Sequence, residues 1–191
     1  MGVRISDTGP SPVLSNLGDP DKDEVRIWRN QNGYLARCFE AGITDWDHYA
    51  MKALRAGLEG QEEGKELSTV SLECEILAAT EWLIHASRKL HRWAEENDED
   101  AANGVYDYSD GLPGGPLFSG RPGLSVARWN FWKERLDELS RKRPKKEPET
   151  TGSEVKGDLS TYELFSQEVY DAIENALKRM REVDDTKSNR A

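Results

Sequence analysis

Glu81 and His85 lie four positions apart in an apolar segment of the chain. On a helix, residues at this spacing share one face, which would bring a carboxylate beside an imidazole. Such a pair could transfer a proton or jointly hold a ligand, so we treat Glu81 and His85 as candidate catalytic residues. The alternative is an ordinary contact between two side chains of one helix, which is the commoner meaning of this spacing.

A second candidate site lies where the stretch GLPGGPLFSGRPG leads into a predicted helix capped by Ser125. Helix amino termini attract anions through their unpaired N–H groups, and Arg121 and Arg128 flank this one. The pattern predicts an anion or small-ligand site, with a rigid packing loop as the alternative. The stretch is not a P-loop, because it has neither G-x-x-x-x-G-K-[ST] nor a preceding strand.

A pocket between helices is a third arrangement that could carry chemistry, with the glycine- and proline-rich stretch as its lid. The expected lining is Glu81, His85, Trp82, Tyr106 and Arg121. Together with Arg128, the last three of these are the candidate ligand-binding residues. Trp82 has an alternative role in the core, because most of the six tryptophans occur at helical positions consistent with burial.

No spacing typical of a metal or cofactor site occurs, and we expect neither. The three histidines form no H-E-x-x-H pattern, and the two cysteines form no C-x-x-C pattern. Cys38 and Cys74 fall at apolar positions of predicted helices and are interpreted as buried, reduced thiols. Cys74 and His85 are separated by about 16 Å along one helix and therefore cannot act together.

The charge balance argues against nucleic acid as a partner. Acidic residues outnumber basic ones by 36 to 26, which gives a formal net charge of −10, whereas phosphate contacts are made by Lys and Arg. No apolar run is long enough to span a membrane. The opening MGVRIS fits the pattern for N-myristoylation at Gly2, with a flexible leader as the alternative.

The expected location is the cytoplasm. The basic run Arg141–Lys146 could serve as a nuclear-import patch. The alternative, which we favour, is the charged end of a helix, where cations suit the helix dipole.

The hydrophobic pattern predicts an all-α fold, a single-domain bundle of about five helices. The expected divisions are a flexible leader (1–20), a helical domain (21–182) that contains a disordered charged linker (141–158), and a flexible tail (183–191). The helices are expected over 21–42, from a Thr44 cap to Gly60, over 68–96, from the Ser125 cap to about 140, and from a Ser160–Glu163 capping box to about Met180. The acidic run 95–100 and the glycine- and proline-rich stretch would form one long connection.

The segment 68–96 is expected to be the central helix of the bundle. Its apolar residues repeat at alternating spacings of four and three, and a second apolar set covers most of the remaining circumference. Only a narrow strip stays polar, formed by Glu73, Thr80, Glu81, Ser87 and Arg88. A helix that is apolar on most sides belongs in the middle of a bundle.

Three stretches carry a resemblance to a known family: YLARCFEAGITDWDHYAMKALRAGLE, AATEWLIHASRKL and GGPLFSGRPGLSVARWNFWKERL. They resemble a family of small uncharacterised proteins from filamentous fungi, over about Val25 to Leu139. The most specific element is R-W-x-F-W-K, here Arg128, Trp129, Phe131, Trp132 and Lys133. The resemblance implies the family's helical layout, and it supplies no catalytic or binding residues.

Two functions are consistent with these patterns. The first is a protein–protein interaction or accessory (scaffold) protein, with a protein partner or a homo-oligomer, because recognisable chemistry is missing while amphipathic helices are plentiful. The alternative is a small cofactor-independent enzyme or ligand-binding protein of fungal secondary metabolism, with a pocket in the bundle. The sequence leaves open whether the protein is an enzyme.

Overall fold

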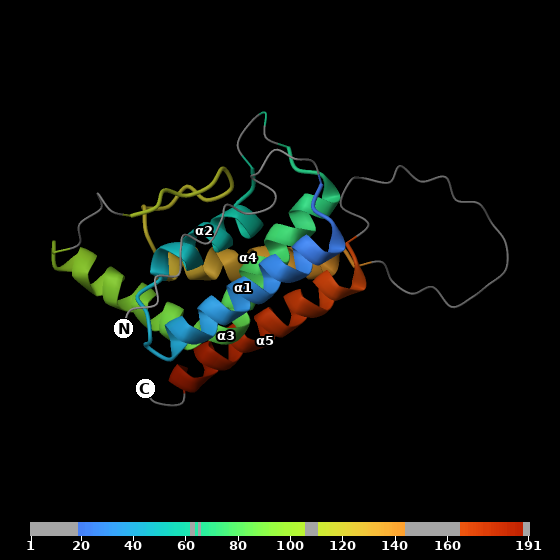
Figure 1. The fold of residues 1–191 in the computed structure, drawn as a ribbon. Helices are drawn as coiled ribbons and strands as arrows, with labels where there is room; N and C mark the ends of the chain where they lie inside the picture. The colour runs from blue at the N-terminus through green and yellow to red at the C-terminus, as the bar shows by residue number, and fades with distance from the viewer. Residues whose placement is uncertain (1–18, 62–63, 65, 106–110, 144–164, 189–191) are drawn as a thin grey trace.

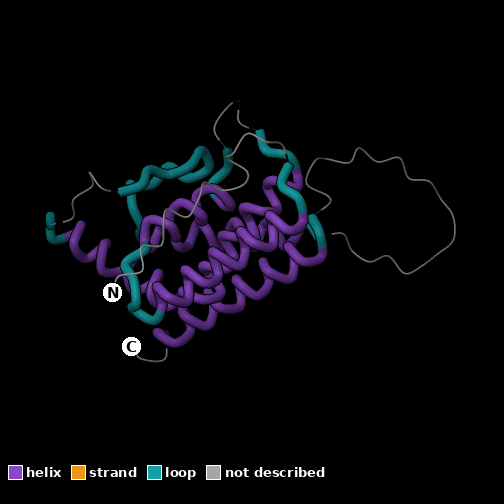
Figure 2. The backbone as a smooth tube through the Cα atoms, viewed as in Figure 1, coloured by secondary structure: helices purple, strands orange, loops and turns teal. Residues whose placement is uncertain are grey.

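The computed structural model describes residues 19–61, 64, 66–105, 111–143 and 165–188, and every regular element in them is a helix. The helices are α1 (Lys22–Glu40), α2 (Asp47–Leu58), α3 (Thr69–Ala102), α4 (Val126–Arg141) and α5 (Gln167–Ser188). Successive helices run in opposite directions and form one bundle (Figures 1 and 2). The predicted all-α bundle is confirmed. The leader up to residue 18, Tyr106 and the linker from 144 to 158 lie outside the described residues.

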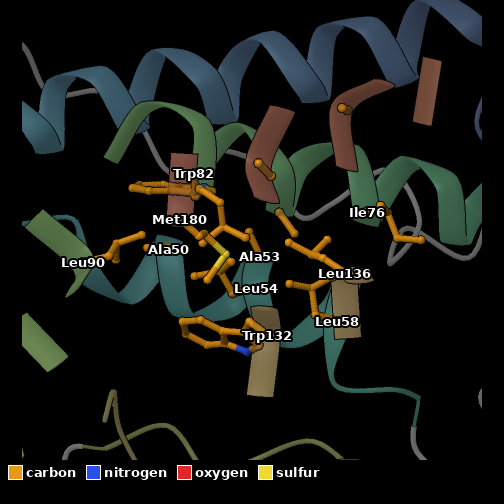
Figure 3. Packing of buried hydrophobic residues seen from close by; sticks show 14 of the residues in the cluster. Ala50, Ala53, Leu54, Leu58, Ile76, Trp82, Leu90, Trp132, Leu136 and Met180 are labelled. Carbon is orange, nitrogen blue, oxygen red and sulfur yellow. The ribbon is translucent and has the colours of Figure 1, made fainter. Parts of the chain in front are cut away.

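Helix α3 occupies the centre of the bundle and contacts each of the other four helices. Trp82 from α3 and Trp132 from α4 are fully buried, and the aliphatic side chains of α2 fill the space between them (Figure 3). By area, burying one such indole contributes about 4–6 kcal/mol before conformational entropy is subtracted. The expected central role of the segment 68–96 is confirmed.

Side chains at the helix ends explain where α1, α3 and α4 begin. Asp21 and Glu24 form a capping box for α1, while Ser68 caps α3 and Ser125 caps α4. The predicted Thr44 cap of α2 is wrong, because α2 begins only after Trp46 and has no side-chain cap. Gly42, which has a positive φ, follows the end of α1, and residues 43–46 connect it to α2.

The acidic run 95–100 is helical, which corrects the predicted loop. Helix α3 continues to Ala102 and projects past its neighbours (Figure 1). Tertiary contacts hold this extension: Asn97 donates a hydrogen bond to the Leu124 carbonyl oxygen at 3.0 Å, and Asp98 accepts one from the Val126 N–H at 3.1 Å. The polar sequence of 95–100 suggested a loop. In the structure, contacts with the start of α4 stabilise this segment as a helix.

Helix α5 begins later than expected. The predicted capping box at 160–163 lies outside the described residues, but Phe165 and Ser166 are not helical, and α5 starts at Gln167. Phe165 contacts Tyr170 with ring centroids 6.0 Å apart, which is the spacing of a hydrophobic staple around Ser166. At its other end α5 continues to Ser188, so residues 183–188 belong to the helix although the tail was expected to begin at 183.

Helix α3 is kinked at Ala86, whose φ of −129° and ψ of 16° are not helical. The Ser87 hydroxyl donates to the Leu83 carbonyl oxygen, a bond that bends helices. The carboxylate of Glu40, at the end of α1, accepts the Lys89 N–H at 3.2 Å and so supplies an acceptor just after the kink. The kink follows His85 immediately and fixes the direction of the α3 face that carries it.

Candidate functional site

Glu81 is the centre of a polar network between α1 and α3. Its carboxylate is 8% exposed, and it accepts a hydrogen bond from Arg29 Nε at 2.7 Å. Its second oxygen lies 3.1 Å from His85 Nε2. Gly33 of α1 makes room for this carboxylate, because a Cβ atom at that position would lie 2.7 Å from Glu81 Oε2. The predicted proximity of Glu81 and His85 is therefore present, inside a larger network.

His85 Nε2 lies between opposite charges, 3.0 Å from Arg37 Nη1 and 3.1 Å from Glu81 Oε2. One ring nitrogen can donate to Glu81 or accept from Arg37, but it cannot do both. Burial is the largest influence on the pKa of His85 and lowers it. The Glu81 charge opposes this lowering, whereas the Arg37 and Arg179 charges add to it. The ring is therefore predominantly neutral near pH 7.

Two surface grooves adjoin the network. Groove A, of about 640 Å³, lies between α1, the first half of α3 and the start of α5, and Arg29, Glu81 and Glu168 line it. Groove B, of about 440 Å³, lies between α3 beyond His85 and the second half of α5, and His85, Arg179 and Glu182 line it. Glu81 thus belongs to one groove and His85 to the other, and their contact joins them.

Trp82 does not take part in either groove. Its ring is fully buried, and its Nε1–H donates to Asn32 Oδ1 at 2.9 Å. Asn32 in turn donates to the Trp28 carbonyl oxygen, so the indole is fixed within the core. The structure therefore places Trp82 in the core, which is the alternative role that the sequence allowed. Glu81 and His85 line grooves at the surface of the bundle.

Glu59, at the end of α2, forms a second polar centre that the sequence did not indicate. Its side chain is completely buried, and each carboxylate oxygen accepts two hydrogen bonds. Oε1 accepts from Arg128 Nε at 2.6 Å and Trp132 Nε1 at 2.7 Å. Oε2 accepts from Arg128 Nη2 at 2.8 Å and the Gly115 N–H at 2.7 Å. The carboxylate is therefore saturated by donors from α4 and the glycine- and proline-rich stretch.

Arg128 is equally saturated, which bears on its predicted ligand role. Its remaining N–H groups donate to backbone carbonyl oxygens of the glycine- and proline-rich stretch, those of Leu112, Pro113 and Gly123. The side chain is completely buried beside the ring of Phe118. An arginine has five N–H donors, and all of them are used here. Arg128 holds the stretch against α2 and α4, and no donor is left for a ligand.

The amino terminus of α4, where an anion was expected, already holds a carboxylate. Asp98 of α3 accepts the Val126 N–H and forms an ion pair with Arg121. Asp98 thus stands where a bound anion would stand. The glycine- and proline-rich stretch borders a third groove, of about 450 Å³, with Asp47 and Trp93. It does not line groove A or groove B, so it is a packing element and not a lid over Glu81 and His85.

Both cysteines are free and buried, and burial raises the pKa of Cys74 to about 12, so its thiol is protonated. No group of three or more His, Cys, Asp or Glu side chains in the described ranges could hold a metal ion. None of the described helices is long and apolar enough to cross a membrane.

The basic run is partly described, and its described residues form ion pairs. Arg141 pairs with Asp137, and Arg143 pairs with Glu174 at 2.6 Å. These contacts agree with the interpretation of the run as the charged end of a helix. Lys145 and Lys146 lie outside the described residues, as does Gly2 with its predicted acylation.

Sequence reasoning missed Arg29, Arg37 and Glu59, because each acts on a partner that is distant along the chain. A signal was present at Gly33, which interrupts an otherwise regular helical pattern. A buried glycine on a helix often marks the close approach of another group. Here it marks the position of the Glu81 carboxylate on α3.

A family model described as protein of unknown function (DUF3632) matches residues 6–136, which is more than half of the chain. No curated protein and no solved structure matches the chain. The sequence predicted a family of unknown function, and that prediction is confirmed. An origin in filamentous fungi stays a prediction.

Proposed function

The chain belongs to the family described as protein of unknown function (DUF3632), and we propose that it is an interaction protein that binds an amphipathic segment of a partner in groove A. The partner segment is a helix with one apolar face, one acidic edge and one basic edge. This proposal follows from the shape and charge of groove A, and the family membership neither adds to it nor opposes it.

The observation that carries the proposal is the arrangement of charges in groove A. Its α1 wall presents Lys22, Arg26 and Arg29, which lie on one face of the helix. Its opposite wall carries Glu73, Glu81 and Glu168 of α3 and α5, of which Glu81 is almost buried and, like Glu168, is paired with Arg29. A groove with walls of opposite charge is complementary to a helix with one acidic and one basic edge.

The floor of groove A supplies the apolar contact that such a helix needs. Val25, Val70 and Leu77 also line groove A, and Leu77 is almost completely buried. Val70 is 42% exposed although it lies on the central helix. Insertion of an apolar helix face into a groove between helices is a recurring mode of peptide recognition.

Two basic side chains at the rim, Lys22 and Arg26, can pair with the incoming segment. Arg29 already bridges the groove to Glu81 and Glu168, so it closes the base. Among the described residues, Arg26 forms an ion pair only with the exposed Asp23, at 2.9 Å, and such a surface pair contributes little. Lys22 and Arg26 can therefore turn toward the acidic edge of a partner.

The proposal can be tested with displayed peptides. A phage library of helix-biased peptides of about 16 residues is selected on the wild-type protein and counter-selected on Val70→Asp. We expect enriched peptides with apolar residues at i, i+3 or i+4 and i+7, acids on one edge and bases on the other. Val70→Asp should weaken their binding at least about tenfold, because it places a charge on the apolar floor.

Val105→Asp is the matched control, because Val105 is 70% exposed and lies beyond the far end of α3. It should leave peptide binding unchanged, and circular dichroism should show both variants folded. No enrichment, or equal binding to Val70→Asp, would refute the proposal. A dimer that Val70→Asp dissociates in sedimentation would also refute it, because a second copy of the chain would then fill groove A.

A further inference from the structure

Groove B brings an imidazole together with arginines and their carboxylate partners Glu40 and Glu182. Arg88 of α3 and Arg179 of α5 line it together with His85. Arg37 of α1 reaches His85 Nε2 from outside the lining, and within the described residues no carboxylate lies within ion-pair distance of it. Arg37 and Arg179, from two different helices, thus act on one neutral ring, and both lower its pKa.

The acidic groups that face His85 are engaged by other donors. Glu40 of α1 accepts Arg88 Nε at 3.2 Å and also the Lys89 N–H. Glu182 of α5 accepts Arg179 Nη1 at 2.8 Å. The Arg179 contact is the main reason that the pKa of Glu182 lies below its usual range. Glu81 completes the set from α3 and is held by Arg29.

The ring of His85 has one nitrogen left for groove B. Nε2 is occupied by the contacts with Glu81 and Arg37, and no hydrogen bond to Nδ1 is present among the described residues. In the neutral ring with its proton on Nε2, Nδ1 is an acceptor. A proton taken from solvent onto Nδ1 makes the ring a cation with a second donor, which would face an anion in the groove.

We propose that groove B binds a small anion, a carboxylate or phosphate group, through His85 and Arg179 with Arg37 behind the ring, and that binding takes up one proton at His85 Nδ1. No covalent bond forms or breaks, because the proton comes from solvent and the anion enters intact. The two grooves share no lining residue, so the site is distinct from groove A, although Glu81 of groove A contacts His85.

Proton uptake makes the affinity depend on pH. The free protein holds His85 neutral near pH 7, because burial and the nearby arginines lower its pKa. A bound anion favours the charged ring, so affinity should rise as pH falls toward the pKa of the free protein. The slope should approach tenfold per pH unit for one proton and vanish below that pKa.

The test is a titration of the histidine side chains by NMR, with ¹³C- and ¹⁵N-labelled histidine. The probes are sodium sulfate for the phosphate class and sodium acetate for the carboxylate class, because both keep a constant charge between about pH 6 and 8. Sodium chloride holds the ionic strength constant. We expect one or both anions to raise the pKa of His85 and to bind more tightly as pH falls. At a given pH, neither anion should change the NMR chemical shifts of His48.

Two arginines of α5 provide matched variants. Arg179→Gln should weaken the anion effect on His85 at least about fivefold. Arg181→Gln should leave it unchanged, because Arg181 contacts Asp137 at 3.2 Å and does not line groove B. Both side chains are more than half exposed, so both variants should fold.

Three results would overturn the proposal. The first is a His85 titration that neither probe changes. The second is an equal effect of chloride at the same ionic strength, which would show screening and not binding. The third is an equal loss in both arginine variants, which would show that only net charge matters. A response to sulfate alone or to acetate alone supports the site and identifies the anion class.

Discussion

Glu59 and Glu81 are two buried carboxylates that each accept an arginine, yet their surroundings differ. Glu59 has four donors, its partner Arg128 is completely buried, and every donor of that arginine is used. Glu81 accepts from Arg29, whose side chain is 29% exposed, and it lies next to His85 Nε2. That nitrogen also faces Arg37, so it can donate to Glu81 or accept from Arg37. The first arrangement is closed to any ligand, whereas the second borders two grooves. Polar groups whose hydrogen bonds are all made inside the protein hold the chain in position. Polar groups with an unused donor or acceptor are available for binding.

The closed centre has a clear structural role. A buried ion pair loses much of its Coulombic gain to desolvation, so its net contribution to stability is small. What Glu59 and Arg128 do is fix the glycine- and proline-rich stretch, since the Gly115 N–H and the carbonyl oxygens of that stretch bond to them. The pair therefore selects one conformation for a segment with no regular structure.

The largest expected effect comes from breaking the closed centre. Arg128→Met should lower the free energy of unfolding by about 3–5 kcal/mol, because it leaves the Glu59 carboxylate buried without its cation. The double variant with Glu59→Met should lose less than the sum of the two single variants, since no charge is then left unpaired. Urea denaturation of all four proteins measures this difference. A loss below about 1 kcal/mol in Arg128→Met would contradict the role assigned to the pair.

Replacing one glycine beside each centre by alanine should show a smaller difference in stability between them. In Gly115→Ala the new Cβ would lie 2.7 Å from the Glu59 carbonyl oxygen, which cannot move easily. We expect a loss of about 1–3 kcal/mol. In Gly33→Ala the new Cβ meets the tip of the Glu81 side chain at 2.7 Å, which can shift, and alanine favours the helix by about 1 kcal/mol.

Denaturation should therefore place Gly33→Ala within about 1 kcal/mol of wild type. NMR should nevertheless show a changed pKa for His85, because the Glu81 carboxylate is displaced. Equal destabilisation by both alanines would mean that the two regions are packed alike.

A still smaller effect concerns pH. The pKa of His85 in the folded chain lies below its ordinary value of about 6.5. Between these two values the unfolded chain binds more protons, so stability rises with pH there and decreases as pH falls. His85→Gln removes this dependence, and its stability should fall less between about pH 7 and 5. Denaturation in chloride buffers checks this, and parallel profiles for the two proteins would contradict it.

The smallest effect concerns Cys74, a buried thiol of α3 that we expect to be unreactive. In Cys38→Ala, which isolates Cys74, reaction with a disulfide reagent at pH 8 should be on the order of a hundredfold slower in the folded than in the unfolded chain. The reason is burial, which raises the pKa of Cys74 to about 12. Comparable rates in both states would show that this part of α3 opens readily.

The fold was largely predictable from the sequence, because its main signals are local. The apolar stripe of α4 follows helical spacing, and Trp129, Trp132 and Leu136 are all buried as expected. The Ser125 cap was equally readable. The acidic run 95–100 was misjudged, because its hydrogen bonds go to residues 27 and 28 positions away. No local pattern reports such contacts.

The site was only half predictable for the same reason. The spacing of Glu81 and His85 on one helix is a local property and was recognised. Arg29, which bonds to Glu81, is 52 positions away, and Glu59 is 69 positions from Arg128. The ligand role expected for Arg128 was overridden by tertiary acceptors. Whether an arginine is free to bind a ligand depends on those acceptors, and the sequence alone does not reveal them.

Unfolding of Glu59→Gln and Glu81→Gln by urea, measured side by side, tests the contrast between the two centres most directly. Both substitutions remove one charge and keep the size of the side chain. We predict a loss of about 3–5 kcal/mol for Glu59→Gln, which strands Arg128 in the core, and about 1–2 kcal/mol for Glu81→Gln, whose partners can reach solvent. Equal losses, or a larger loss for Glu81→Gln, would contradict the division into a closed structural centre and an open centre that borders two grooves.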